Sequence, residues 1–142
     1  MKKWTNAQKG KRTSHFDGIS KSLPSLLAAF QIGQRVSHFG FDWARPMDAF
    51  QKVKEEVHEL EEALESGKKE EVAEEVGDIL FALANTARLL GVNPEIALMA
   101  ANAKFIERFF RMEKKLKEQG RELGQASLED MDQIWEALKK KE

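Results

Sequence analysis

Two pairs of acidic residues, each spaced three positions apart, have the side chains and spacing best suited to chemistry. Glu56 and Glu59 form a Glu-x-x-Glu step, and Glu75 and Asp78 form a Glu-x-x-Asp step. On a helix, residues three apart lie about 5–6 Å from each other on one face. At an effective dielectric constant of about 20, two like charges about 4 Å apart repel by about 4 kcal/mol. Four converging carboxylates therefore predict a site for a hard cation, unless these side chains stay apart in water.

The helices that must position these acids follow from the apolar spacing. A helix is expected to begin near Pro46, because apolar residues then recur every three or four positions, at Phe50, Val53, Val57, Leu60 and Leu64. A second helix, over residues 68–90, is apolar on nearly every side after Val76, which predicts that it is buried. The break at Ser66 and Gly67 folds the second helix back beside the first. The two acidic steps are then expected to face each other across one groove.

Asp78 distinguishes a metal site from a merely solvated acidic face. It is the one acid within the apolar part of residues 68–90. A buried, unpaired carboxylate costs several kcal/mol or gives up its charge. Acids on a helix usually form a solvated face, and that interpretation suits most glutamates of this region. It does not explain Asp78, which is expected to need a partner.

The remaining elements are also helical. Ser22 is expected to be the N-cap, with Pro24 in the first turn, of a helix that ends near Ser37, and a loop follows. Residues 94–119 carry two apolar stripes with a basic ridge between them, and two apolar stripes imply two neighbouring helices. The first stripe is Ile96, Met99, Ala103, Ile106 and Phe110, and the second is Phe105, Phe109, Met112 and Leu116. The basic ridge is Lys104, Arg108 and Arg111. A capping box at Ser127 to Asp130 opens a last short helix. No strand pattern occurs, so the expected fold class is all-α.

Composition restricts the class of protein and the ligands of any metal. The chain has 142 residues, of which 42% are hydrophobic and 33% are charged, and this composition suits one globular domain. The domain is expected over residues 20–142. Residues 1–19 are expected to be a flexible basic arm or the remnant of a linker. The net charge of −1 argues against stable nucleic-acid binding. There is no cysteine, and the three histidines lack ligand spacing, so a metal must bind through oxygen. No signal peptide or membrane span is evident, which favours a cytoplasmic protein.

The order of the motifs resembles the MazG family of nucleoside triphosphate pyrophosphohydrolases. These motifs are Gly40-Phe41-Asp42-Trp43, Glu55-Glu56-x-x-Glu59, Glu75-x-x-Asp78, and Asn102-x-Lys104-Phe105 with Arg108. The resemblance covers about residues 17–140 and is greatest to the C-terminal catalytic domain of two-domain members. The sequence does not include their N-terminal MazG domain, so it is expected to be either a fragment of such a protein or a short member of the family. It implies an all-α homodimer built on four-helix bundles. It also implies cleavage between the α- and β-phosphates, dependent on Mg²⁺ with Mn²⁺ as the alternative ion, to give a nucleoside monophosphate and pyrophosphate.

The resemblance also assigns roles to individual residues. The positions that match the metal ligands are Glu56, Glu59, Glu75 and Asp78. Those expected to bind the nucleotide substrate are Lys104, Arg108 and Trp135, together with Asn102 of the matching motif. The catalytic glutamates are expected among Glu55, Glu56 and Glu59, and either Glu55 or Glu59 could take the proton from the attacking water.

Two other functions remain open from the sequence. A related all-α pyrophosphohydrolase with a narrower range, acting on dUTP, dCTP or phosphoribosyl-ATP, would share the acidic helices. A helical interaction module without enzymatic activity would explain the apolar stripes without any metal. The second alternative predicts that Asp78→Asn leaves function intact.

Overall fold

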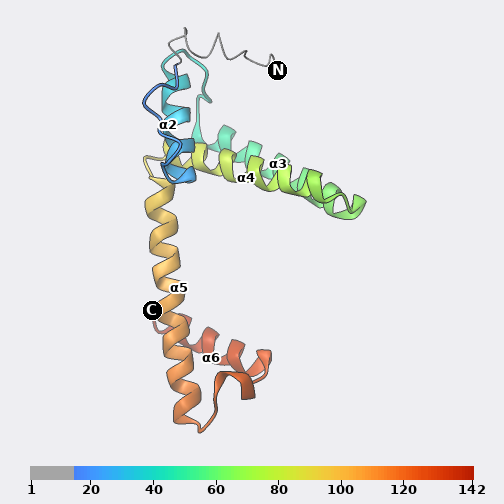
Figure 1. The fold of residues 1–142 in the computed structure, drawn as a ribbon, viewed down its shortest axis with the longest axis vertical. Coiled ribbons are helices and arrows are strands. Elements are labelled where there is room, and N and C mark those ends of the chain that lie inside the picture. The colour runs from blue at the N-terminus through green and yellow to red at the C-terminus, as the bar shows by residue number, and fades with distance from the viewer. Residues whose placement is uncertain (1–14) are drawn as a thin grey trace. The chain divides into compact units, whose positions relative to one another are not determined.

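The computed structural model describes residues 15–142, and all regular secondary structure in that range is helical (Figure 1). The elements are α2 (Ser25–Ser37), α3 (Pro46–Ser66), α4 (Lys69–Leu89), α5 (Pro94–Glu118), the short 3₁₀ helix η1 (Leu123–Gln125) and α6 (Leu128–Lys140). This confirms the all-α prediction. The chain divides into two compact units, the first ending at Glu95 and the second being Ile96–Glu142.

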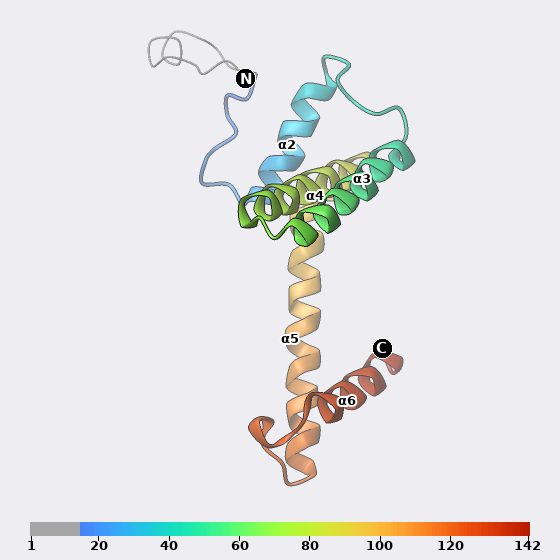
Figure 2. The same ribbon diagram turned by 90° about the vertical axis from the view of Figure 1, so that its right-hand side faces the viewer.

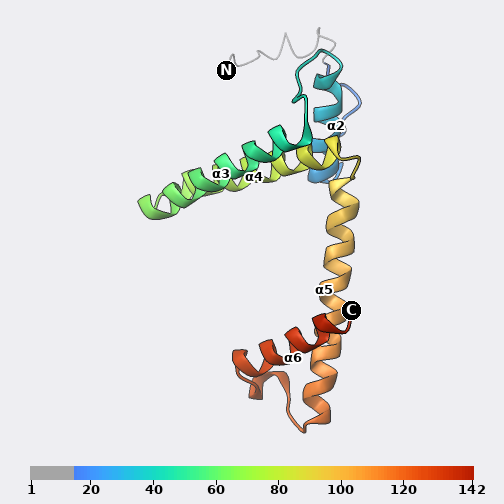
Figure 3. The same ribbon diagram turned by 180° about the vertical axis from the view of Figure 1, so that it is seen from behind.

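The first unit is organised by the antiparallel pair of α3 and α4, which lie side by side in Figures 1 and 3. Gly67 ends α3 with a φ of 71°, a left-handed conformation that glycine adopts without the steric cost of a Cβ. The amide of Gly67 donates to the carbonyl of Ala63, which satisfies one of the last free carbonyls of α3. The predicted break at Ser66 and Gly67 is therefore confirmed, and it reverses the chain within a few residues.

Small residues fill much of the interior of this unit. The buried apolar residues are Ala29 on α2, Ala49, Val53 and Ala63 on α3, and Ala82 and Ala84 on α4. Helix α2 packs on α4, as Figure 2 shows from the side. At the contact, a Cβ on Gly33 would overlap the side-chain oxygen of Asn85 and approach Nε of Arg88 to 2.7 Å. The absence of a side chain at Gly33 is therefore what lets α2 come this close to α4.

The expectation that α4 is buried is wrong for the single chain. Its apolar residues Val76, Leu80, Phe81 and Leu83 are each more than 40% exposed, and Asp78 is exposed as well. The periodicity identified an apolar helix correctly, but α2 and α3 cover only part of its circumference. An apolar face of α4 is left uncovered.

The second unit packs α6 against the C-terminal half of α5. Met112 and Leu116 of α5 and Leu138 of α6 are buried, and the rings of Phe105 and Trp135 lie 4.9 Å apart. The predicted capping box is confirmed, because the Asp130 amide donates to Ser127 Oγ and the Ser127 amide donates to the Asp130 carboxylate. One apolar stripe of α5 thus has a neighbour in the unit. The other stripe is largely exposed, notably at Ile96, Met99, Ile106 and Phe110.

The N-terminal part of the chain differs from the expectation in one detail. Helix α2 begins at Ser25 with Pro24 in the capping position and no side-chain cap, so the predicted N-cap at Ser22 is wrong. Of the expected N-terminal arm, residues 15–19 lie against α2, where Arg35 donates to the carbonyls of His15 and Asp17. The rest of that arm, residues 1–14, lies outside the described residues. Among the helices described, none combines the length and apolar character needed to cross a membrane.

Candidate metal and anion sites

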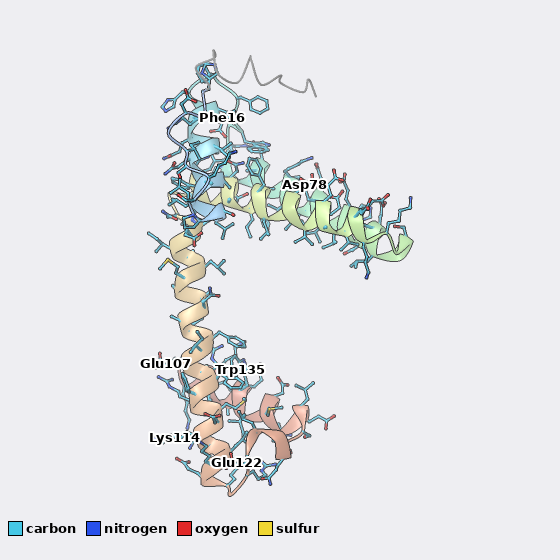
Figure 4. All side chains as sticks on the ribbon, in the orientation of Figure 1. Phe16, Asp78, Glu107, Lys114, Glu122 and Trp135 are labelled. Carbon is cyan, nitrogen blue, oxygen red and sulfur yellow. The ribbon has the colours of Figure 1, made fainter. Side chains whose placement is uncertain are left out.

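The antiparallel pairing of α3 and α4 brings acidic side chains from both helices together. Glu56 on α3 and Glu75 and Asp78 on α4 each place one carboxylate oxygen within 4.8 Å of the others. Figure 4 labels Asp78 on α4. The two acidic steps therefore face each other as their spacing predicted, and this acidic cluster contains three of the four predicted ligands.

Two oxygens of the acidic cluster have no hydrogen-bond partner among the described residues. They are Oε2 of Glu56, a residue only 6% exposed, and Oε2 of Glu75. A buried carboxylate oxygen without a partner costs free energy, because it has lost water and gained nothing in exchange. Since every donor atom in the cluster is a carboxylate oxygen, the residues fit a hard divalent cation such as Mg²⁺, Mn²⁺ or Ca²⁺.

The two facing glutamates have opposite shifts in pKa. Lys52 Nζ lies 3.0 Å from Glu56 Oε1, and this hydrogen bond is the main reason why the pKa of Glu56 is lowered. The pKa of Glu75 is raised to about 7, chiefly by its contact with Glu56, with burial and the charges of Glu59, Glu56 and Asp78 adding to the effect. Without a cation, Glu56 is therefore an anion, while Glu75 keeps a proton until near neutral pH.

Glu59 and Glu55 lie at the edge of the acidic cluster rather than in it. Both are exposed on α3. Glu59 is close enough for its charge to raise the pKa of Glu75. Glu55 instead lies 3.6 Å from Lys52 Nζ at the surface. The assignment of Glu59 as a fourth ligand stays a prediction.

In the second unit, Arg108 and Trp135, two of the residues expected to bind the nucleotide, contact each other. Arg108 is 8% exposed, and its guanidinium carbon lies 5.0 Å from the centre of the Trp135 ring, a cation–π geometry. Figure 4 shows Trp135 on α6. The Arg108 guanidinium donates two hydrogen bonds to the carboxylate of Glu142, from Nε at 2.9 Å and from Nη2 at 2.5 Å.

Three basic side chains act on the carboxylate of Glu142. The pKa of Glu142 is lowered first by its hydrogen bonds with Arg108, and the charges of Arg108, Arg111 and Lys104 lower it further. Arg111 Nη1 lies 4.0 Å from Glu142 Oε1. The predicted basic ridge of Lys104, Arg108 and Arg111 thus acts on one anionic group. Asn102, the remaining predicted substrate residue, is exposed on α5.

Three contacts were missed by the sequence reasoning. Lys52 carries a usable signal, because it lies four residues before Glu56, within reach on the same helix. Asp42 pairs with Arg88, 46 positions away, and Glu142 pairs with Arg108, 34 positions away. Nothing in the local sequence indicates either of these long-range pairs.

Comparison with known proteins relates these residues to an enzyme family. Residues 46–115 match the model of the MazG nucleotide pyrophosphohydrolase domain. The chain is 40% identical over 133 residues to the "nucleoside triphosphate pyrophosphohydrolase/pyrophosphatase MazG" of Thermotoga maritima, covering 93% of this chain and 51% of that protein. It is 38% identical over 141 residues to the "nucleoside triphosphate pyrophosphohydrolase" of Escherichia coli K12, covering 96% of this chain and 52% of that protein.

The matches cover only part of the relatives and only part of this chain. The chain spans about half the length of these two relatives. The family match includes α3, α4 and most of α5, and so contains the acidic cluster, Glu59, Lys104 and Arg108. It ends before α6 and Trp135.

Proposed function

We propose that this chain, which belongs to the MazG family of nucleotide pyrophosphohydrolases, hydrolyses nucleoside triphosphates between the α- and β-phosphates. Water is consumed, and a nucleoside monophosphate and pyrophosphate are released. Such an enzyme removes unwanted nucleotides from the cellular pool, so we place its action in the cytoplasm, where that pool is kept. The relatives named above carry this activity in their names.

The observation that carries the proposal is the pair of unpartnered oxygens in the acidic cluster. Glu56 Oε2 and Glu75 Oε2 are buried from opposite helices, and Asp78 adds a third carboxylate. A purely structural cluster would be expected to pair these oxygens with basic or amide groups. A divalent cation instead satisfies them and offsets the repulsion between the carboxylates.

Glu56, Glu75 and Asp78 would hold Mg²⁺, with Mn²⁺ as a substitute ion. When bound, the ion supplies positive charge for the phosphate oxygens and makes water more acidic. Mg²⁺ usually keeps several waters and takes the remaining ligands from substrate phosphates, which suits a cluster of a few carboxylates. Lys52 keeps Glu56 ionised, and therefore ready to bind the cation, through their 3.0 Å contact.

Glu59 is the better candidate for the base that takes a proton from the attacking water. Its carboxylate lies close enough to influence Glu75, yet it is exposed and outside the acidic cluster. Glu55 is paired with Lys52 at the surface, which leaves it less free to accept a proton. We therefore assign the base to Glu59 and a supporting role to Glu55.

Arg108 and Lys104 are proposed to bind phosphate oxygens of the substrate, and Trp135 to contact the nucleotide. The planar guanidinium matches phosphate geometry with two parallel hydrogen bonds, a mode already adopted toward Glu142. Asn102, on the exposed part of α5, is a polar contact for the same substrate. These roles follow from the family resemblance, and they are supported by the effect of Arg108 and Lys104 on the carboxylate of Glu142.

We also propose that the chain forms a homodimer. Each unit exposes apolar residues on one helix, on α4 in the first unit and along one stripe of α5 in the second, and each set is larger than scattered surface residues would give. Two α3–α4 pairs that bury these faces would produce the four-helix bundle expected for the family. A second copy of this chain is the occupant we propose, because a two-fold dimer would cover the same apolar face on both copies.

A pyrophosphate-release assay over the eight common ribo- and deoxyribonucleoside triphosphates, with and without Mg²⁺, tests the proposal. Turnover is expected with Mg²⁺ or Mn²⁺ and is expected to vanish in excess EDTA. Activity restricted to dUTP or dCTP would indicate the narrower pyrophosphohydrolase. Full activity in EDTA would refute a metal-dependent enzyme, and no turnover of any nucleotide would favour the interaction module.

Asp78→Asn is the variant that separates a metal site from a structural acid. It preserves shape but weakens one ligand, so we expect turnover to fall about 100-fold or more. Glu74→Gln is a matched control, because Glu74 is exposed on α4 and outside the acidic cluster. Normal turnover of Asp78→Asn would show that Asp78 does not serve the reaction.

A further inference from the structure

The contact between Arg108 and Glu142 occupies the group that the proposed function needs for substrate phosphate. Both hydrogen bonds come from one edge of the guanidinium, Nε and Nη2, and end on the two oxygens of one carboxylate. This is also the edge that a phosphate group engages bidentately. Glu142 and a phosphate therefore cannot use it at the same time.

The position of Glu142 is set by the end of α6. The amide of Lys141 donates to the carbonyl of Leu138, and the amide of Glu142 donates to the carbonyl of Lys139. These bonds continue the last turn of the helix and deliver the Glu142 side chain to Arg108. Arg108 in turn is held from the other side by Trp135. The ion pair is thus built from both helices of the second unit.

The carboxylate is held firmly enough to compete but not enclosed. Arg108 has a side chain 9% exposed, whereas that of Glu142 is 29% exposed. Lys104 and Arg111 also favour an anion at this position through their charges. Glu142 can therefore move into water while the basic groups remain in place for another anion.

We infer that Glu142 is an internal competitor for the oxyanion site at Arg108, and that the polyphosphate of the substrate must displace it. This inference rests on the proposed function for the identity of the substrate, but not for the exchange itself. Displacement breaks the two hydrogen bonds from Arg108 to Glu142 and forms equivalent bonds to phosphate oxygens. Glu142 thereby sets how tightly the chain binds its substrate.

The size of the effect follows from the fraction of molecules in which Arg108 is free. If Glu142 occupies Arg108 about 90% of the time, the apparent affinity for a phosphate ligand is about tenfold lower than the intrinsic affinity. Removing the carboxylate removes this loss. Glu142→Ala is therefore expected to bind phosphate ligands about tenfold more tightly than the unchanged chain.

Inorganic pyrophosphate is the probe, and its binding is measured by titration calorimetry on the full chain without hydrolysis. The variants are Glu142→Ala, Glu142→Gln and the control Glu136→Gln. Glu136 acts on Arg108 only through its charge, without a hydrogen bond, so this control reports any general effect of losing one negative charge. We expect a lower dissociation constant for both Glu142 variants, largest for Glu142→Ala, and a change of less than about twofold for Glu136→Gln.

A second pair of variants assigns the effect to Arg108. In the Glu142→Ala background, Arg108→Ala is expected to abolish the gain in pyrophosphate affinity. Thermal melts accompany each titration, because a merely structural ion pair predicts a lower melting temperature with unchanged or weaker binding. That result would overturn the inference, and so would equal gains for Glu136→Gln and the Glu142 variants.

The outcome is separable from that of the proposed function. Tighter pyrophosphate binding by Glu142→Ala, without turnover of any nucleoside triphosphate, would support Glu142 as a competitor for Arg108 but would refute the pyrophosphohydrolase activity. Turnover by the unchanged chain, with no gain in pyrophosphate affinity in Glu142→Ala, would support the pyrophosphohydrolase activity but would refute Glu142 as a competitor for Arg108.

Discussion

Arg88 on α4 donates two hydrogen bonds to the carboxylate of Asp42, Nη2 to Oδ1 at 2.6 Å and Nη1 to Oδ2 at 3.1 Å. This pair ties the loop between α2 and α3 to the C-terminal end of α4. Arg88 also donates to the side-chain oxygen of Asn85, beside the close approach of Gly33. Asp42 is the acid of the Gly-Phe-Asp-Trp motif, so the structure gives this motif a positioning role for the loop.

Asp42→Asn is expected to destabilise the chain by about 1–3 kcal/mol at pH 7, because it weakens two hydrogen bonds between charged groups, of which the Arg88 side chain is only 9% exposed. The pKa of Asp42 is lowered, chiefly by its hydrogen bonds with Arg88. This contribution is therefore present above the ordinary aspartate pKa and is lost as pH falls through the lowered value. Urea unfolding at pH 7 and pH 3 measures it. Asp48→Asn, at an exposed ion pair with Arg45, is the control, and an equal loss there would contradict the prediction.

The raised pKa of Glu75 predicts a pH dependence of stability in the opposite direction. Below the unfolded-state pKa near 4.5, Glu75 is protonated in both states and carries no penalty. As pH rises toward about 7, Glu75 loses its proton more readily in the unfolded chain than in the folded one. The free energy of unfolding of the metal-free chain therefore falls over this range. Urea unfolding in EDTA should show the stability gain of Glu75→Gln growing from pH 4.5 to about 7 and then levelling off. A gain independent of pH would rule out this assignment.

Metal binding is expected to be linked to the same proton. Glu75 must lose its proton to act as a ligand, so Mg²⁺ should raise the melting temperature more at pH 8 than at pH 6. Differential scanning calorimetry with and without Mg²⁺ measures this difference. In Asp78→Asn the rise should be smaller at both pH values, whereas in Glu74→Gln it should be retained. An equal rise at the two pH values in the unchanged chain would argue against Glu75 as a ligand.

The exposed stripe of α5 predicts that one charged substitution weakens the proposed dimer. Phe110 is 64% exposed in the single chain, and a glutamate there would place a charge in the buried interface. Light scattering coupled to size exclusion is expected to show a monomer for Phe110→Glu at micromolar concentration. Lys114→Glu, at an exposed residue one turn further along α5 (Figure 4), is the matched control. A monomeric unchanged chain would reject the dimer.

The elements of this fold that were predictable are those determined locally. Gly67 and the capping box at Ser127 lie where the chain must turn or begin a helix, and nearby residues suffice to define both. The convergence of Glu56 with Glu75 and Asp78 was also predictable, because a short turn forces α3 and α4 to be antiparallel neighbours. Pro24 shows the limit of such reasoning at α2, where no side chain caps the helix.

The features that were not predictable depend on contacts distant in sequence or on which faces are covered. Apolar periodicity identified α4 as a helix but could not show that Leu80 and Phe81 lack a cover within the chain. The partner of Arg108 could not be found from spacing, since Glu142 reaches it only after α6 has brought the chain back to α5. The raised pKa of Glu75 depends on how closely two helices approach, which no linear pattern measures.

The alanines between the helices of the first unit bear on which ion the acidic cluster would select. The separation of packed helices ranges over about 8–10 Å according to the side chains at the contact. Ala49 and Ala63 on α3 and Ala82 on α4 are nearly fully buried, so methyl groups fill much of the interior of the unit that carries the acidic cluster. Mg²⁺ needs oxygens at about 2.0–2.1 Å, whereas Ca²⁺ accepts about 2.3–2.6 Å. A larger buried side chain, as in Ala82→Val, would move the carboxylates further apart. The cluster would then bind Ca²⁺ better relative to Mg²⁺, although no ligand has changed.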